Sequence, residues 1–277
     1  MVPLSAYKQY FDMETIESII PKVQVNIPFT MLYESYLETF IEYGLNPEIG
    51  LDAAALDRFS MADVSGIAEK LHKNSRTVTL HGPFIDLSAG SPDSAVRRLT
   101  RRRLEQLLKL VPLFSPRSVV CHAGYDAKRY GYFKDNWLEN SLELWSWMAD
   151  RVAEHGARLM LENVYEDGPA DLQFLFERLK NQKVGFCLDS GHASAFGQAD
   201  LKAWLDTLGP YLGQLHLHDN RGNDDEHLVM GNGMIDFSIL FNYLKLNNNL
   251  SPIVTLEPHV EKDLWPSLEY LAQKWPW

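Results

Sequence analysis

Short runs of β-type residues alternate with long amphipathic segments along this 277-residue chain. The predicted strand ends recur about every 33 residues, which is the spacing of a βαβ unit. Such alternation implies a parallel sheet with right-handed crossovers. The eight predicted strands are Val23–Pro28, Leu45–Gly50, Arg76–His81, Ser118–His122, Arg158–Glu162, Val184–Asp189, Gly213–His218 and Ile253–Glu257.

An amphipathic segment follows each predicted strand. With eight such units and no linker rich in Pro, Gly or Ser, the chain fits one α/β domain over residues 1–277, a closed (β/α)8 TIM barrel. A doubly wound open sheet is the alternative, but the chain lacks the early Gly-x-Gly-x-x-Gly turn of that fold. The predicted helices are Met31–Tyr43, Met61–His72, Asp93–Val111, Asp135–His155, Ala170–Lys180, Ala199–Leu208, Phe237–Leu246 and Lys262–Trp275.

The overall charge and the apolar segments limit the partners and the location of the protein. A formal net charge of −11 excludes a global basic surface for nucleic acid and leaves room only for a local one. No apolar run approaches the ~20 residues that span a bilayer. The segment Met1–Glu17 lacks a basic region followed by an apolar core. We therefore expect no membrane association, no secretory signal and a cytoplasmic location.

Cys121 and Cys187 each lie in an apolar stretch, where a reduced and buried thiol is expected. With so few thiols, a metal site would have to use His, Asp and Glu. The chain has nine histidines, and only His72 and His155 fall at predicted helix ends. The other seven lie at or just beyond predicted strand ends, so their placement is the more informative feature.

Active residues of such barrels gather at the carboxyl ends of the strands. Any one ionisable residue there would be explained as an ordinary hydrogen-bonded or salt-bridged group. Their coincidence at six consecutive strand ends predicts a shared centre for divalent metal, with Zn²⁺, Mn²⁺, Co²⁺ or Mg²⁺ suited to imidazole and carboxylate ligands. These residues are His81, His122, Glu162, Asp189, His192, His216, His218, Asp219, Asp225, His227, Glu257 and His259.

Local spacing adds two expectations about orientation. A strand has a period of two, so His216 and His218 should share a face and Asp219 should take the other. In the sequence Asp189-Ser-Gly-His192, a turn at the glycine should bring the imidazole back over the carboxylate at the strand end.

Several motifs resemble those of the xylose isomerase-like barrel superfamily, which includes sugar isomerases, sugar epimerases and abasic-site endonucleases of the endonuclease IV type. The similarity extends over nearly the whole chain. The motifs are HGPFIDL (81–87), VVCHAG (119–124), LENVY (161–165), GFCLDSGH (185–192), LHLHDN (215–220), DEH (225–227) and LEPH (256–259).

Resemblance to the isomerase and epimerase branch implies four metal ligands, Glu162, Asp189, His216 and Glu257. It also implies that Glu162 and Glu257 are the acid–base pair that moves substrate protons through an enediolate, and that His192 holds the sugar oxygens. We therefore expect a divalent-metal isomerase or epimerase of a sugar or sugar phosphate. A non-catalytic sugar-binding module on the same fold is a further alternative.

Resemblance to the endonuclease branch implies phosphodiester hydrolysis by a trinuclear zinc cluster, so that one to three ions per chain are possible. Two features depart from that branch: Ser190-Gly191 stands where it has Thr-Cys, and His218 stands where it has Asn. The loop Leu51–Ser60 offers only Arg58 and Phe59 for entering a duplex. The nine matching ligands are His81, His122, Glu162, Asp189, His192, His216, Asp225, His227 and Glu257.

Basic residues near the predicted mouth are candidates for substrate binding. Lys128 and Arg129 lie among aromatic residues in the segment 125–137, which is either a lid over the substrate or a packed surface loop. Arg221 follows the seventh predicted strand and is a candidate for a phosphate group. The arginine-rich segment 97–103 should form a solvated face paired with acidic neighbours. The sequence predicts no oligomeric state.

Overall fold

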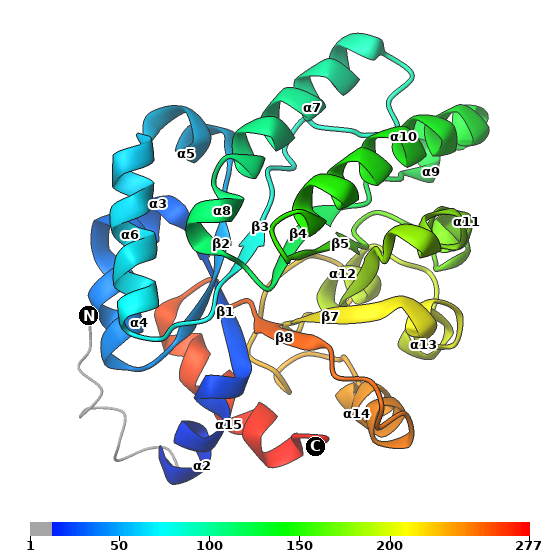
Figure 1. Ribbon diagram of the computed structural model, residues 1–277. Helices are drawn as coiled ribbons and strands as arrows, with labels where there is room; N and C mark the ends of the chain where they lie inside the picture. The colour runs from blue at the N-terminus through cyan, green and yellow to red at the C-terminus, as the bar shows by residue number, and fades with distance from the viewer. Residues whose placement is uncertain (1–12) are drawn as a thin grey trace.

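The computed structural model describes residues 13–277 and contains a closed barrel of eight parallel strands surrounded by helices (Figure 1). Each strand pairs with the next along the chain, and β1 closes the barrel against β8 with Val23 opposite Val254. The predicted (β/α)8 fold is confirmed. The strands are β1 (Val23–Pro28), β2 (Asn46–Gly50), β3 (Thr79–His81), β4 (Ser118–His122), β5 (Arg158–Glu162), β6 (Gly185–Asp189), β7 (Leu212–Leu217) and β8 (Ile253–Leu256).

The helices form the outer ring, and α2 lies beside α15 (Figure 1). The expectation of no secretory signal concerns mainly the first twelve residues, which lie outside the described part of the chain. The helices are α2 (Met13–Ile19), α3 (Phe29–Met31), a π-helical turn (Leu32–Tyr36), α4 (Leu37–Glu42), α5 (Ala53–Arg58), α6 (Met61–Lys73), α7 (Ser94–Leu108), α8 (Val111–Phe114), α9 (Ala127–Tyr130), α10 (Lys134–Ala153), α11 (Ala170–Leu179), α12 (Ser190–Ala195), α13 (Leu201–Leu208), α14 (Phe237–Leu246) and α15 (Leu264–Lys274).

Strands β2, β6 and β8 are one residue shorter than predicted, and β3 and β7 differ in ways that have a structural cause. Arg76 and Thr77 precede β3 and form hydrogen bonds outside the strand ladder. Arg76 Nε donates to Asn74 O at 2.9 Å, and Thr77 N donates to the side-chain oxygen Asn46 Oδ1 at 3.0 Å. Strand β7 ends at Leu217, and Asp219 forms an isolated antiparallel bridge with Leu228 instead. His218 therefore lies just beyond β7, where the chain leaves the barrel.

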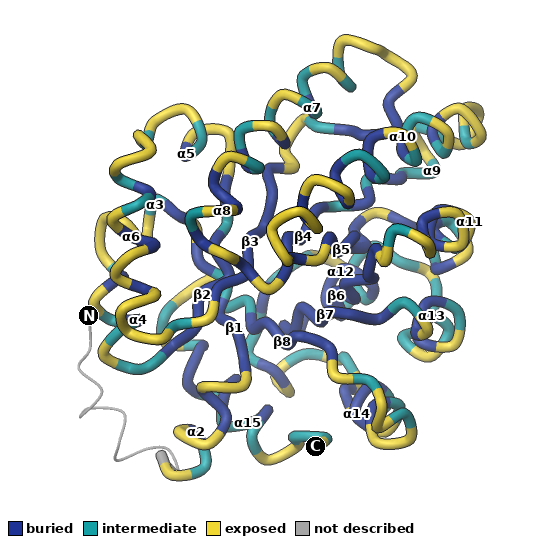
Figure 2. Tube along the Cα trace, in the orientation of Figure 1, coloured by how far each residue is buried: buried dark blue, intermediate teal, exposed yellow. Residues whose placement is uncertain are grey.

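The strands are buried on both faces, as parallel strands covered by helices must be (Figure 2). Large apolar side chains such as Trp137, Trp204 and Phe176 fill the layer between barrel and helices. The inside of the barrel is partly polar, since Glu48 and Gln214 are also fully buried. No helix within residues 13–277 is both long and apolar enough to cross a bilayer.

Candidate metal centre

The ionisable residues predicted at the strand ends lie together at one mouth of the barrel. Glu162 is at its middle and is 1% exposed. Its Oε2 lies 3.0 Å from His81 Nε2 and 3.7 Å from His122 Nε2. Its Oε1 lies 3.1 Å from His192 Nδ1 and 3.4 Å from His216 Nδ1. Four imidazoles from four different strand ends thus surround one buried carboxylate.

Asp189 begins a second row of donors that leads away from Glu162. Its Oδ1 lies 3.1 Å from His218 Nε2, and its Oδ2 lies 3.6 Å from His192 Nδ1. The Oδ2 atom of Asp225 lies 3.4 Å from His192 Nε2 and 3.1 Å from His227 Nε2. Imidazoles and carboxylates therefore alternate from β6 to the loop that follows β7.

The predicted turn after Asp189 is the first turn of helix α12. Asp189 Oδ1 caps this helix by accepting from His192 N at 2.6 Å. The same carboxylate thus fixes the backbone of His192 and faces its side chain, as the sequence led us to expect.

Glu257 completes the centre from the end of β8. Its Oε1 lies 3.0 Å from His216 Nδ1, and its Oε2 lies 3.9 Å from His218 Nε2 and 4.0 Å from His227 Nδ1. His216 Nδ1 is therefore approached by two glutamates, Glu162 and Glu257, from strands that have β6 and β7 between them.

Backbone carbonyl groups orient three of the imidazoles. The Nδ1 atoms of His81, His192 and His227 lie 3.0, 3.0 and 2.8 Å from carbonyl oxygens. A carbonyl oxygen only accepts, so these Nδ1 atoms carry the proton in the neutral ring and Nε2 carries the lone pair. Such fixing of the tautomer is typical of histidines that bind metals.

His216 is held by a residue that was not predicted from the sequence, Glu48 in β2. Glu48 Oε1 lies 2.9 Å from His216 Nε2, and both residues are 0% exposed. Glu48 Oε2 accepts from Thr79 Oγ1 at 2.7 Å and from Gln214 Nε2 at 2.5 Å. A glutamate inside a predicted buried strand was the available signal, because a buried carboxylate almost always has a partner.

Asp219 organises the loop that carries Asp225 and His227. It is buried, and its carboxylate accepts hydrogen bonds of 2.9–3.1 Å from the backbone amides of Gly231, Gly233 and Ile235. Its side chain therefore bonds to the backbone of the loop rather than to the imidazoles, consistent with the predicted difference between Asp219 and the two preceding histidines.

The donor atoms fit a divalent metal. His216 Nδ1, His218 Nδ1 and Asp225 Oδ1 are buried and have no hydrogen-bond partner among the described residues. An unpaired buried polar atom costs about 1–3 kcal/mol, which a bound cation would offset. In each of four sets of residues, one donor atom per residue lies within 4.8 Å of the others. The sets are His81, Glu162 and His216; Asp189, His192 and His218; His218, His227 and Glu257; and Glu48, His216 and Glu257.

Burial and neighbouring charges shift the titration of these groups in different directions. Burial favours the neutral form of Glu162, but the charge of His216 and the hydrogen bonds from His192 and His216 outweigh it and hold the pKa of Glu162 well below its ordinary value. Burial prevails at Glu257 and raises its pKa. Burial also lowers the pKa of His122 to about 3, which leaves its imidazole neutral and able to bind a cation.

A cavity of 430 Å³ opens beside His122, under the loop that follows β3. Phe84 stacks on the His122 ring with centroids 4.2 Å apart and lines this cavity together with Tyr165. Of the basic residues predicted to bind substrate, Arg129 also lines it. Its guanidinium lies 3.3 Å from Asp126.

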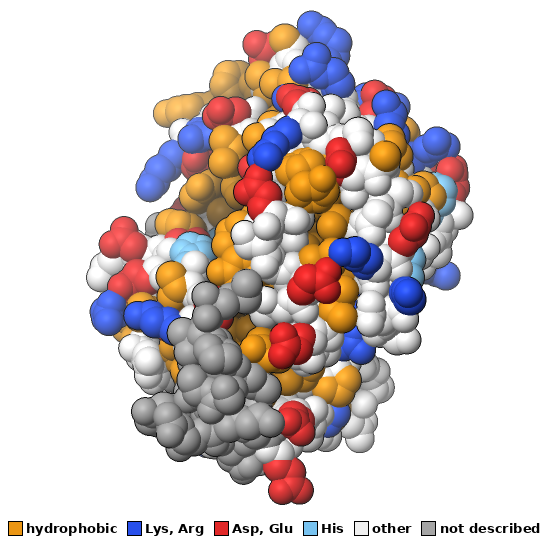
Figure 3. Space-filling view, turned by 90° about the vertical axis from the view of Figure 1, so that its left-hand side faces the viewer, with side chains coloured by type: hydrophobic (Ala, Val, Ile, Leu, Met, Phe, Trp, Pro, Cys, Tyr) orange, Lys and Arg blue, Asp and Glu red, His pale blue; other side chains and the backbone are white. Residues whose placement is uncertain are grey.

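The other two basic candidates do not line this cavity. Lys128 is exposed, and Arg221 pairs with Glu226 through its guanidinium while its backbone N donates to Glu226 Oε2 at 2.9 Å. On the face shown in Figure 3, acidic and basic side chains are interspersed and form no continuous basic stripe among the described residues.

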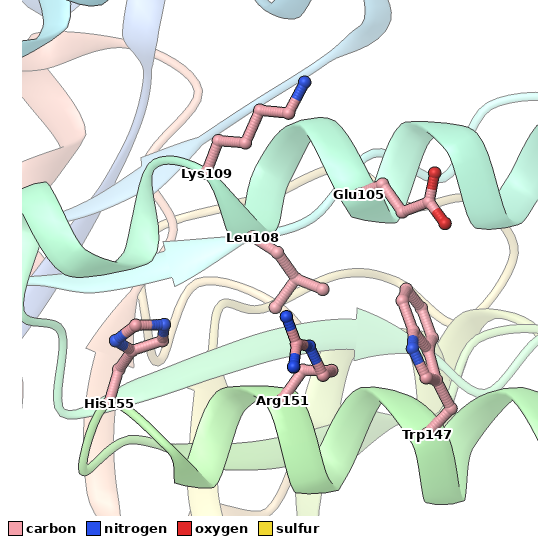
Figure 4. Close-up of a pocket in the computed structure, with 6 residues that line it drawn as sticks. All are labelled: Glu105, Leu108, Lys109, Trp147, Arg151 and His155. Atoms are coloured by element: carbon pink, nitrogen blue, oxygen red, sulfur yellow. The ribbon is translucent and has the colours of Figure 1, made fainter.

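A second cavity, of 570 Å³, lies between α7 and α10 (Figure 4). Trp147, Arg151 and His155 line one wall, and Glu105 and Lys109 belong to the other. His155 precedes β5, so this end of the groove lies toward the amino ends of the strands. The neighbouring Arg101 stacks over Trp147 at 4.1 Å and pairs with Glu105, consistent with the paired basic face predicted for segment 97–103.

A family profile described as xylose isomerase-like TIM barrel matches residues 41–274. The chain belongs to this family. Within the xylose isomerase-like family, the chain is 27% identical over 203 residues to the uncharacterized protein MJ1311 of Methanocaldococcus jannaschii, covering 71% of this chain and 69% of that protein. It is also 27% identical over 192 residues to a probable endonuclease 4 of Mycobacterium leprae, covering 65% of this chain and 73% of the relative.

Solved structures of this barrel type superpose well on the chain. The TTHB071 protein from Thermus thermophilus, soaked with ZnCl2, has a TM-score of 0.75 and 27% identity, and the match covers 92% of this chain and 98% of that one. A D-tagatose 3-epimerase-like protein has a TM-score of 0.75 and 24% identity, with 91% and 96% covered. The second likeness shows the fold alone.

Proposed function

We propose that this protein is a divalent-metal-dependent isomerase or epimerase of a small sugar or sugar phosphate. The observation that carries the proposal is the convergence of two buried glutamates on one imidazole. Glu162 Oε1 and Glu257 Oε1 lie 3.4 and 3.0 Å from His216 Nδ1. Carboxylates held on two sides of one site are suited to acid–base catalysis, in which one takes a proton from a substrate carbon. The other can return a proton to the opposite face of that carbon, as in an epimerase, or to the neighbouring carbon, as in an isomerase.

Glu162, Asp189, His216 and Glu257 would hold the cation. A divalent cation at this position would polarise a carbonyl–hydroxyl pair of the substrate. Glu162 and Glu257 would then remove and return the proton on the adjacent carbon. His192, next to Glu162, would hold a sugar oxygen, and the closed barrel below the mouth would keep water from the far side.

The surroundings of the centre favour a small substrate over a nucleic-acid duplex. The 430 Å³ cavity has the size of a small-molecule site. The exposed ring of Phe84 offers an apolar face to a sugar. Arg58, at the end of helix α5 that follows β2, pairs with Glu34 at 2.7 Å, so its charge is partly neutralised.

Solvent-proton exchange tests the proposal directly. The metal-loaded protein is incubated in D2O with a panel of ketoses, aldoses and their phosphates, and deuterium incorporation is followed by NMR or mass spectrometry. We expect incorporation into at least one substrate with the wild type and none with Glu257→Gln. Glu154→Gln, an exposed glutamate paired with Arg151, is the matched control and should behave like the wild type. Retained exchange in Glu257→Gln would overturn the assignment.

Phosphodiester hydrolysis by a three-ion centre is the second candidate. It is supported by the number of donors at the mouth, which exceeds the four that a single-ion sugar site needs, and by relatives named as probable endonuclease 4. Metal analysis of the purified protein and a nicking assay on abasic DNA test it. One ion per chain together with intact DNA would reject this candidate, whereas three ions with nicking would replace the sugar proposal.

A further inference from the structure

The feature that the four-ligand arrangement leaves unexplained is His218. Its side chain is 1% exposed and lies between two carboxylates: Nε2 is 3.1 Å from Asp189 Oδ1, and Nδ1 is 3.7 Å from Asp225 Oδ1. Both His218 Nδ1 and Asp225 Oδ1 are buried without a hydrogen-bond partner among the described residues. Two unpaired buried atoms that face one another at this separation need a common partner.

The position of the His218 ring depends on a glycine. A Cβ atom on Gly191 would lie 1.9 Å from His218 Cε1 and 2.4 Å from its Nδ1, so any other residue at 191 would displace the imidazole. Gly191 has no left-handed backbone conformation that would otherwise call for glycine, and it lies in helix α12, where alanine is the better helix former. The space that Gly191 leaves is therefore occupied by His218.

We propose that His218 is a metal ligand in its own right, made possible by Gly191, on the side of the centre formed by Asp189 and Asp225. The inference rests on the proposed metal centre and adds a residue to it.

The distances around His218 are those of atoms that share an ion. Ligand atoms about 2.1 Å from a tetrahedral cation lie about 3.4 Å from one another. His218 Nδ1 lies 3.7 Å from Asp225 Oδ1, close to this value. On the other edge of the ring, His218 Nε2 lies 3.1 Å from Asp189 Oδ1 and 3.9 Å from Glu257 Oε2. His218 belongs to two of the sets whose donor atoms lie within 4.8 Å, one with Asp189 and His192 and one with His227 and Glu257.

If His218 had only a structural role, both of its ring nitrogens would be expected to have hydrogen-bond partners. The ring of His218 stacks on that of His227 with centroids 3.7 Å apart, so packing accounts for the plane in which the His218 ring lies. Packing does not account for the unpaired Nδ1, because a histidine held only by stacking would normally direct its second nitrogen to a carbonyl, as His81, His192 and His227 do.

Cobalt binding tests the inference without reference to turnover. The metal-free protein is titrated with Co²⁺, and the visible absorption, the number of ions per chain and the Kd from chelator competition are measured. We expect His218→Asn to change the absorption bands and to weaken one class of sites at least about tenfold. His155→Asn, at an exposed histidine far from the mouth, is the matched control and should leave both unchanged.

A double-mutant cycle tests the role of Gly191. Gly191→Ala alone should weaken cobalt binding as His218→Asn does, because it displaces the ring. In the double variant Gly191→Ala/His218→Asn the two losses should not add, since the ring that a methyl group at position 191 would strike is gone. Additive losses would overturn the link between Gly191 and His218.

A variant that gains a spectroscopic band, rather than losing binding, separates an effect on the metal site from misfolding. His218→Cys should give a sulfur-to-cobalt charge-transfer band that the wild type lacks, provided that thermal unfolding shows the metal-free variant to be folded. An unchanged spectrum and affinity in His218→Asn, or no new band in a folded His218→Cys, would overturn the inference. If cobalt binding follows His218 while no sugar exchanges deuterium, the proposed function fails and this ligand stands.

Discussion

Glu48 Oε1 lies 2.9 Å from His216 Nε2, and the other nitrogen of the same ring lies 3.0 Å from Glu257 Oε1. The imidazole is thus held between a carboxylate inside the barrel and a carboxylate at its mouth. This arrangement fixes the ring and increases its basicity toward a cation at Nδ1.

Removing the charge of Glu48 should therefore weaken metal binding indirectly, through its effect on His216. We expect Glu48→Gln to raise the metal Kd by about 10–100-fold, because the amide still fills the space but no longer supports His216 electrostatically. Chelator competition measures this change. Thr255→Val removes a 3.2 Å hydrogen bond to Glu48 and one of 3.2 Å from Gln214 but leaves the charge of Glu48, so it should have a much smaller effect. Equal effects of the two variants would contradict this explanation.

Asp225 distinguishes the two candidate functions. The single-ion sugar site does not require it as a ligand, whereas the three-ion hydrolase does. If the sugar proposal is right, Asp225→Asn should retain deuterium exchange within about tenfold of the wild type, because the weakened contacts to His192, His227 and His218 leave Glu162, Asp189, His216 and Glu257 in place. Complete loss of exchange together with loss of bound ions would favour the multi-ion centre instead.

Arg129 and Arg221 should differ in their effect on substrate binding. Both pair with a carboxylate, Asp126 and Glu226 respectively, but Arg129 lines the cavity beside His122 and Arg221 does not. We expect Arg129→Ala to raise KM for a phosphorylated substrate several-fold with little change in kcat, since a contact of a side chain that is 74% exposed contributes about 1 kcal/mol or less. Arg221→Ala should leave KM nearly unchanged. The reverse pattern would locate the phosphate group at the end of β7.

Metal removal should destabilise the fold. Four of the carboxylates at the mouth, those of Glu162, Asp189, Asp225 and Glu257, lie within 4.0 Å of imidazole nitrogens, and a cation would satisfy the atoms that remain unpaired. We expect chelation to lower the free energy of unfolding by about 3 kcal/mol when the ion had been present at a hundred times its Kd. Calorimetry with and without chelator measures the change, and adding Zn²⁺ or Mn²⁺ back should restore Tm. A Tm insensitive to chelator would contradict a tightly bound ion.

Glu166 should make the stability depend on pH. Burial raises its pKa to about 7, although the backbone amides of Val164 and Tyr125 donate to its carboxylate at 2.7 and 3.1 Å. A raised pKa means that the folded state favours the protonated form. The stabilisation is thus fully present below about pH 4.5 and is lost as the pH rises through about 7, at a cost of about 3 kcal/mol.

Urea unfolding of the metal-free wild type and of Glu166→Gln at pH 5 and pH 8 checks this effect. The difference between the two proteins isolates Glu166 from the histidines of the mouth, which titrate in both. The wild type should lose more stability than the variant between these pH values. Parallel behaviour would show that Glu166 does not titrate in this range.

Several parts of the centre follow from local sequence pattern. The strand–helix alternation predicts the barrel, and the rule that functional residues gather at the carboxyl ends of the strands singles out His81, His122, Glu162 and Asp189. Both inferences use residues that are close in the chain, since a strand, its end and the turn that follows are local features. The distances between these side chains then follow from closing the barrel.

Other parts depend on neighbours that are remote in the chain. Glu48 is 168 positions before His216, and its role appears only when β2 and β7 face each other across the inside of the barrel. The relation of Gly191 to His218 depends on α12 packing against the end of β7 at a distance that no spacing in the sequence encodes.

The sequence by itself determined the eight-fold βα order and the ionisable residues at the strand ends, because periodicity and turn chemistry act over a few residues. Only the tertiary structure decided which nitrogen of each imidazole faces a carboxylate, which buried atoms lack a partner and which basic side chains are already paired. Those properties depend on distances of about 3 Å between segments that meet only when the barrel closes.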